Sequence, residues 1–104
     1  MKLSGKVALI TGGSRGIGFA IAKTLSENGA LVVITSKNSD KIKKAESKIS
    51  NSFGITCDIK NKNQVQNVIN QTIKKFGKLD ILVNLIKIIK FYEINSINCW
   101  LVDL

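Results

Sequence analysis

The sequence of 104 residues contains no histidine, no proline and a single arginine, Arg15. The lack of an imidazole excludes a histidine general base, a histidine-containing metal site and a Ser-His-Asp triad, because each needs a group that accepts a proton or donates a lone pair. The two cysteines, Cys57 and Cys99, lack the CxxC spacing of redox pairs and zinc sites. We therefore expect free thiols and no metal site.

Acidic residues and long apolar runs are also scarce. There are 16 Lys and Arg residues against 7 Asp and Glu, giving a net charge of +9. Abundant Lys, Ile and Asn with so little Arg is typical of codon bias in an AT-rich genome, and this interpretation is favoured over nucleic-acid binding. No apolar stretch has the length of a membrane span or a signal-peptide core. The composition predicts a cytoplasmic protein, with an organelle matrix as the alternative.

The chain does contain apolar runs of strand length at residues 7–10, 31–35, 53–59 and 79–84. Between them, apolar residues recur at helical spacing. Three strand-helix units in alternation imply right-handed crossovers and a parallel sheet with helices on both faces. We expect one domain over residues 1–104, with an α/β, Rossmann-like, doubly wound fold truncated after about four strands.

The expected helix ends carry local signals. The first helix should stop at Asn28-Gly29, and Asn38 or Ser39 should cap the second. Asn61 and Gln64 resemble a capping box that opens a third helix ending at Gly77. Near the end of the chain, Ser96 is expected to cap a short helix that contains Trp100.

A glycine-rich segment, T-G-G-S-R-G-I-G at residues 11–18, follows the first predicted strand and opens the first helix. At that position a glycine turn lets the backbone approach a pyrophosphate, which free amides and the helix dipole stabilise. The spacing is not G-x-G-x-x-G, and a P-loop is excluded because Phe19 stands where a lysine is needed. A turn that uses glycine for geometry alone is the alternative.

The T-G-x-x-x-G-x-G pattern after V-A-L-I resembles the cofactor signature of classical short-chain dehydrogenases/reductases. The resemblance continues through Asn28-Gly29-Ala30, Cys57-Asp58-Ile59 and F-G-K-L-D-I-L-V-N at residues 76–84. It implies that Asp58 accepts a hydrogen bond from the adenine amino group, and that Asn84 supports the sheet and the cofactor. Turn formation is the alternative for both. The residues implied to line the pyrophosphate and adenosine ribose are Gly12, Ser14, Arg15, Gly16, Ile17 and Gly18.

In such folds an acidic residue after the second strand bonds the ribose 2′-hydroxyl of NAD. Ser36 and Lys37 stand there instead. Without a carboxylate to repel a 2′-phosphate, and with Arg15 and Lys37 to attract one, the residues favour NADP(H) over NAD(H). A solvated lysine is the alternative for Lys37.

Two departures from the family pattern bear on activity. Leu85-Ile86-Lys87 replaces Asn-Ala-Gly and would crowd the nicotinamide ribose. The only tyrosine, Tyr92, is followed four positions later by Ser96, so the Tyr-x-x-x-Lys pair is missing and no catalytic residue is assigned. We interpret the chain as a fragment, or as a frameshifted or decayed reading frame, resembling 3-oxoacyl-acyl-carrier-protein reductases.

The expected function is therefore the NADP(H)-binding portion of an oxidoreductase that is inactive by itself. The alternatives are a vestigial nucleotide-binding protein without catalysis and a basic module that binds polyanions. A sheet lacking its later strands would also expose residues 79–84 as an unprotected edge, through which copies of the chain could associate.

Overall fold

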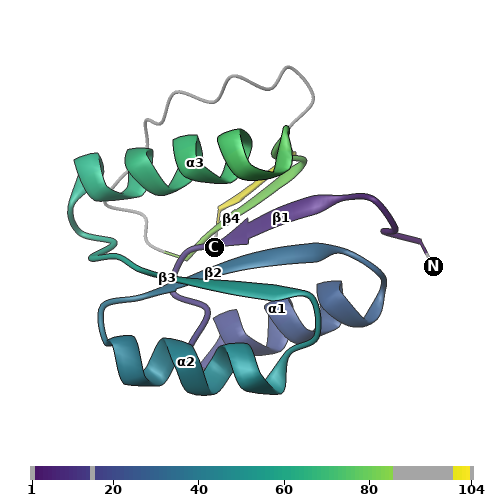
Figure 1. Ribbon diagram of the computed structural model, residues 1–104, viewed down its shortest axis with the longest axis horizontal. Helices are drawn as coiled ribbons and strands as arrows, with labels where there is room; N and C mark the ends of the chain where they lie inside the picture. The colour runs from purple at the N-terminus through teal and green to yellow at the C-terminus, as the bar shows by residue number, and fades with distance from the viewer. Residues whose placement is uncertain (1, 15, 86–99, 104) are drawn as a thin grey trace.

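The computed structural model describes residues 2–14 and 16–85 with their side chains, and residues 100–103 as backbone. Strands and helices alternate along the chain (Figure 1). The strands are β1 Val7–Ile10, β2 Leu31–Ser36, β3 Ser52–Thr56, β4 Ile81–Asn84 and β5 Trp100–Asp103. The helices are α1 Gly16–Glu27, α2 Ser39–Lys48 and α3 Lys62–Phe76. In the part of the chain that is described, no helix has the length and apolar character needed to cross a membrane.

The strands form one parallel sheet in the order β3-β2-β1-β4-β5. The central strand β1 is paired on both sides, with Leu9 opposite Val33 of β2 and Leu82 of β4. The strand order reverses between β1 and β4, since β2 and β3 lie on one side of β1 and β4 on the other. The doubly wound parallel sheet expected from the sequence is thus confirmed. In such sheets ligands bind at the reversal, beyond the carboxyl ends of the strands.

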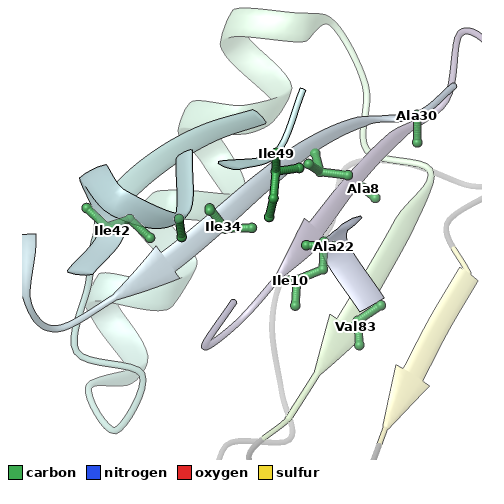
Figure 2. Packing of buried hydrophobic residues seen from close by; sticks show 10 residues of the cluster. Ala8, Ile10, Ala22, Ala30, Ile34, Ile42, Ile49 and Val83 are labelled. Carbon is green, nitrogen blue, oxygen red and sulfur yellow. The ribbon is translucent and has the colours of Figure 1, made fainter. Parts of the chain in front are cut away.

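Helices cover both faces of the sheet, α1 and α2 on one face and α3 on the other (Figure 1). Because strand side chains alternate between faces, Ile10 belongs to the cluster under α1 and α2, whereas Leu9 belongs to the cluster under α3. Figure 2 shows the first cluster, which contains Ala22 of α1, Ile10 of β1 and Val83 of β4. Burial on both faces explains why the strand sequences are continuously apolar instead of alternating with polar residues.

The helix ends follow the local signals in the sequence. Asn38 caps α2, its side chain accepting two backbone N–H groups of the first turn. Asn61 caps α3 by accepting the N–H of Gln64 at 3.1 Å. The Gln64 side chain reaches further back than in a standard capping box, since its Oε1 accepts the N–H of Asp58 at 2.8 Å. The α3 helix ends at Gly77, whose φ of 82° is left-handed.

β3 is shorter than predicted. It ends at Thr56, so residues 57–59 lie in the loop that follows. The chain turns there because Asp58 accepts the backbone N–H of Lys60 through Oδ1 at 3.0 Å, a local bond that competes with continuation of a strand.

The helix predicted around Trp100 is wrong. Residues 100–103 form β5, which pairs in parallel with β4 and places Trp100 opposite Ile81. A strand is favoured because β4 presents backbone N–H and C=O groups on its outer side, and W-L-V-D contains aromatic and β-branched residues. Ser96, the expected helix cap, lies outside the described residues. The unprotected edge predicted at residues 79–84 is also wrong, because β4 is an interior strand of the sheet.

The outer strand β3 is protected on its open side by α2. In the parallel register, alternate N–H groups of β3 face β2 while that of Gly54 faces outward. The Gly54 N–H donates to Oε2 of Glu46 at 2.5 Å. A Cβ at Gly54 would lie 2.6 Å from Cγ1 of Ile42, so glycine is needed for α2 to approach this closely. The Glu46 carboxylate thus covers a backbone donor that would otherwise be open to another strand.

We expect Glu46→Ala to lower the free energy of unfolding by about 1 kcal/mol, because it leaves the Gly54 N–H without its carboxylate acceptor. Self-association through β3 should increase as well. Thermal melts and sedimentation velocity measure the two effects, and Glu46→Gln is the matched control because it retains an acceptor oxygen. A Glu46→Ala chain that melts and sediments like the parent would show that this contact does not protect the edge.

Candidate functional site

The connection from β1 to α1 begins with residues 11–14, which we call the glycine turn. Gly12 has a left-handed φ of 82°. Its N–H donates to Oγ1 of Thr35 at 3.0 Å, and the Gly13 N–H donates to the Thr35 carbonyl oxygen at 3.1 Å. Thr35, which is buried in β2, therefore holds the turn against the carboxyl end of the sheet. No local signal in the sequence marks Thr35, because its role depends on β2 lying beside β1.

Two further glycines of the segment are required by close packing. A Cβ at Gly18 would lie 2.4 Å from the carbonyl oxygen of Gly12 and 2.7 Å from Cδ1 of Leu85. At Gly13, a Cβ would lie 2.7 Å from Cγ2 of Ile34. The first turn of α1 thus packs directly on the backbone of the glycine turn, which brings the start of the helix to the end of β1.

Gly16 is required for a different reason. Its φ is 62°, while a Cβ built on it would have no atom of the described residues within 4 Å. The backbone there is left-handed but the space above it is open. The neighbouring Ile17 is 71% exposed, which is unusual for a large apolar side chain. Arg15, which precedes Gly16 in the sequence, lies outside the described residues.

A pocket of 330 Å³ opens at the carboxyl ends of β1, β2 and β3, and we call it the strand-end pocket. It brings together four of the predicted site residues: Gly12 and Ser14 from the glycine turn, Lys37 from the end of β2 and Asp58 from the end of β3. The full lining is Gly12, Ser14, Ser36, Lys37, Cys57, Asp58, Ile59 and Lys60. Three distant segments of the sequence thus converge at the place where doubly wound sheets bind ligands.

Asp58 lies in the loop that follows β3. It lines the strand-end pocket, and its Oδ1 accepts the N–H of Lys60 at 3.0 Å. Its own N–H is bound to the Gln64 side chain at 2.8 Å. The turn-forming interpretation is therefore confirmed as geometry, and the same hydrogen bonds hold the carboxylate at the wall of the pocket.

Cys57 was expected only as a free thiol, but it lines the strand-end pocket. Its side chain is 2% exposed, and it lies beside Asp58 in the pocket lining. Burial raises the pKa of the Cys57 thiol, and the negative charge of Asp58 raises this pKa further. The thiol therefore stays protonated at neutral pH and contributes an apolar surface to the pocket. No local signal marked this role, because residues 53–59 were predicted as one strand and β3 ends at Thr56 only in the folded chain.

A second opening, of 380 Å³, lies between the start of α1 and the face of α2, and we call it the lysine cleft. It shares Ser14 with the strand-end pocket and contains Gly16. The full lining is Ser14, Gly16, Phe19, Lys41, Lys44, Ala45 and Lys48. All charged residues of this lining are lysines, so the cleft favours an anionic group next to the glycine turn.

Asn84 lies on the opposite side of the turn from the strand-end pocket. It is 3% exposed, and the Thr11 hydroxyl lies 3.3 Å from its Oδ1. The same hydroxyl lies 3.3 Å from the carbonyl oxygen of Val83 and accepts the N–H of Leu85 at 3.2 Å. Thr11 and Asn84 thus join the ends of β1 and β4 at the reversal of strand order.

Comparison with known proteins agrees with this architecture. The family model described as short chain dehydrogenase matches residues 6–98. Tropinone reductase-like 3 of Erythroxylum coca is 39% identical over 87 residues, and L-fucose dehydrogenase of Bos taurus is 36% identical over 83 residues. Each match covers 80% of this chain, and 34% and 31% of those proteins respectively.

Solved structures show the same relationship. A hydroxysteroid dehydrogenase from Escherichia coli superposes with a TM-score of 0.75 at 38% identity, over 80% of this chain and 36% of that one. A 7α-hydroxysteroid dehydrogenase complexed with NADH and 7-oxo glycochenodeoxycholic acid gives the same TM-score and identity, over 34% of its length. The chain thus spans about a third of these relatives. The matched residues, the sheet order and the glycine turn together show that the chain belongs to the short-chain dehydrogenase/reductase family.

Proposed function

We propose that this chain binds NADP(H) in preference to NAD(H), holding the adenosine 2′-phosphate half at the strand-end pocket and the adjoining lysine cleft. The observation that carries the proposal is the convergence of the glycine turn, Lys37 and Asp58 on one pocket at the strand ends. In enzymes that use this cofactor, the bound nicotinamide accepts or donates a hydride. The proposal for this chain concerns binding alone.

The local geometry fits a phosphate group next to the glycine turn. The first N–H groups of a helix have no carbonyl partner within the helix, and they stabilise an anion together with the helix dipole. At α1 this end carries Gly16, whose missing side chain leaves open space above the backbone. Ser14 lines both adjoining openings, and we expect its hydroxyl to donate to the same group.

The preference for NADP(H) rests on charge. The end of β2 carries Ser36 and Lys37, and the Ser36 hydroxyl accepts the N–H of Asn38 at 3.2 Å. The position where an acidic residue would bind the 2′-hydroxyl of NAD is thus taken by a serine engaged in its own turn. Lys37 lines the strand-end pocket, while Lys41 lines the lysine cleft beyond Ser14. A 2′-phosphate placed between the two openings would meet cationic groups on both sides.

We further propose that the chain by itself transfers no hydride. In its sequence the only tyrosine is Tyr92, and the residue four positions on is Ser96 instead of a lysine. The proton that a reduced carbonyl oxygen takes up needs a positioned donor. Both residues lie outside the described part of the chain, so this proposal rests on the sequence alone.

Calorimetric titration with NADPH and NADH tests the cofactor proposal. We expect the parent chain to bind NADPH at least about tenfold more tightly, a difference of about 1.4 kcal/mol. Lys37→Asp should remove most of this preference by placing a carboxylate beside the 2′-phosphate. Lys43→Asp, on an exposed part of α2 outside both linings, is the control with the same change of charge. Equal affinities of the parent chain for the two cofactors would overturn the preference.

An absorbance assay at 340 nm with NADPH and a generic β-ketoacyl substrate tests the proposal that the chain transfers no hydride. Turnover by the purified chain would contradict it.

The calorimetric titrations, repeated at several salt concentrations and with an unrelated polyanion, separate nucleotide binding from general attraction to a basic surface. A steep salt dependence shared by all polyanions would favour the basic-module alternative.

A further inference from the structure

The ligand crevice of a doubly wound sheet has two halves, one on each side of the point where the strand order reverses. Here the strand-end pocket occupies the half above β1, β2 and β3. The other half lies above β4 and β5, and the first residue after β4 at its carboxyl end is Leu85. The side chain at this position therefore influences how far a ligand extends beyond the glycine turn.

The Leu85 side chain lies against the glycine segment. Its Cδ1 is 2.7 Å from where a Cβ of Gly18 would stand, and 3.9 Å from the corresponding point at Gly12. Cδ1 of Ile59 lies 3.5 Å from the same point at Gly12. The glycine turn is thus flanked by two apolar side chains, Ile59 on the strand-end pocket and Leu85 on the β4 side.

Leu85 is also held in place. Its N–H donates to Oγ1 of Thr11, which is 1% exposed, at 3.2 Å. Its half-buried side chain packs against the core cluster under α1 and α2, to which Val83 belongs. Turning the side chain of Leu85 aside would therefore expose apolar surface to water, and shifting its backbone would break a hydrogen bond to a buried hydroxyl. Both changes cost free energy.

We propose that Leu85 occupies the entrance to the second half of the crevice, so that the ligand recognised by this chain is an adenosine nucleotide bearing 2′- and 5′-phosphates. The inference rests on the proposed NADP(H) site and narrows it: NADP(H) binds through its adenosine half, and its nicotinamide ribose half adds nothing to the affinity. A ribose pressed onto the isobutyl group of Leu85 would lose water without gaining a hydrogen bond there. The strand-end pocket, at 330 Å³, is at the lower end of the ~300–1,000 Å³ range of ligand pockets.

The test compares 2′,5′-ADP, NADPH and nicotinamide mononucleotide by calorimetry on the whole chain. The parent chain should bind 2′,5′-ADP and NADPH with affinities equal within about threefold, and should not bind nicotinamide mononucleotide. Leu85→Ala should make NADPH bind about tenfold more tightly than 2′,5′-ADP, because the opened half now contributes about 1.4 kcal/mol. Leu25→Ala is the matched control: Leu25 is a half-buried leucine that packs against the same cluster but lies near the far end of α1.

The outcomes separate this inference from the proposed function. Failure of 2′,5′-ADP to bind the folded parent chain would overturn both. Binding of 2′,5′-ADP together with NADPH binding that is tenfold tighter in the parent chain would overturn the role of Leu85 and leave the NADP(H) site standing. The parent ratio is decisive even where Leu85→Ala fails to fold, and Leu85→Asn then provides a polar variant of similar size. A ratio shifted equally by Leu25→Ala would attribute the effect to stability and overturn the inference.

Discussion

Gly18→Ala is expected to disrupt the glycine turn and to abolish nucleotide binding. The added methyl carbon would lie 2.4 Å from the Gly12 carbonyl oxygen and 2.7 Å from Cδ1 of Leu85. The first of these atoms belongs to the backbone, so α1 must move away from the turn. Overpacking of this kind typically costs about 1–3 kcal/mol, and the larger side chain of Gly18→Val should cost more.

Gly16→Ala is the matched comparison for Gly18→Ala, because it introduces backbone strain without a steric clash. A Cβ at Gly16 meets no atom of the described residues within 4 Å, while the φ of 62° costs an L-residue about 1 kcal/mol. This variant should fold with a slightly lower melting temperature. We expect it to bind 2′,5′-ADP more weakly, since the methyl group stands in the open space that a phosphate would enter. Thermal melts and calorimetry measure both effects, and a Gly18→Ala chain with parental stability and affinity would contradict the packing described.

Leu82→Ala should lower the free energy of unfolding more than the other variants, although Leu82 is not among the residues that line the strand-end pocket. Leu82 is fully buried in β4 and packs in the cluster under α3. Truncation of such a leucine costs about 2–5 kcal/mol, a large share of the total stability of about 5–15 kcal/mol for a domain. Urea denaturation should therefore show a much lower midpoint, or no folded baseline at all.

The contrast for Leu82 is Ile17→Ala, which removes an apolar side chain that is 71% exposed. This change should alter the free energy of unfolding by no more than about 0.5 kcal/mol. Similar midpoints for the two variants would mean that Leu82 is not a core residue of the chain in solution.

Most of the helices and strands could be predicted from short stretches of the sequence. Short apolar runs, helical spacing and the end signals at Asn38, Asn61 and Gly77 act within a few residues, so β1 to β4 and the three helices follow from them. Two elements were predicted wrongly, for different reasons. β3 stops early because Asp58 accepts the N–H of Lys60, a local hydrogen bond. Residues 100–103 form a strand because of tertiary context, since β4 offers them backbone partners.

The sequence predicted a nucleotide site at the glycine turn, but it identified only some of the residues that line the strand-end pocket. The glycines and Asp58 carry local signals, since a turn after a strand needs particular residue types. Thr35 and Cys57 carry none that reveals their role, because that role depends on segments that are distant in the sequence. Leu85 was marked by its departure from the family pattern, but its contact with Gly18 was not predictable. The Thr35 hydroxyl accepts the N–H of Gly12, 23 residues away, and Leu85 reaches Gly18 only through the pairing of β4 with β1.

The sequence by itself determined the strand-helix alternation, the glycine turn after the first strand, and the excess of lysine, because these depend on residue type and short-range spacing. Only the tertiary structure decided which side chains meet at the strand ends. Parallel pairing brings the ends of β1, β2 and β3 to one edge, where Gly12, Lys37 and Asp58 share a pocket. The same pairing places Leu85 against Gly18 across the reversal of strand order, a contact that no local pattern contains.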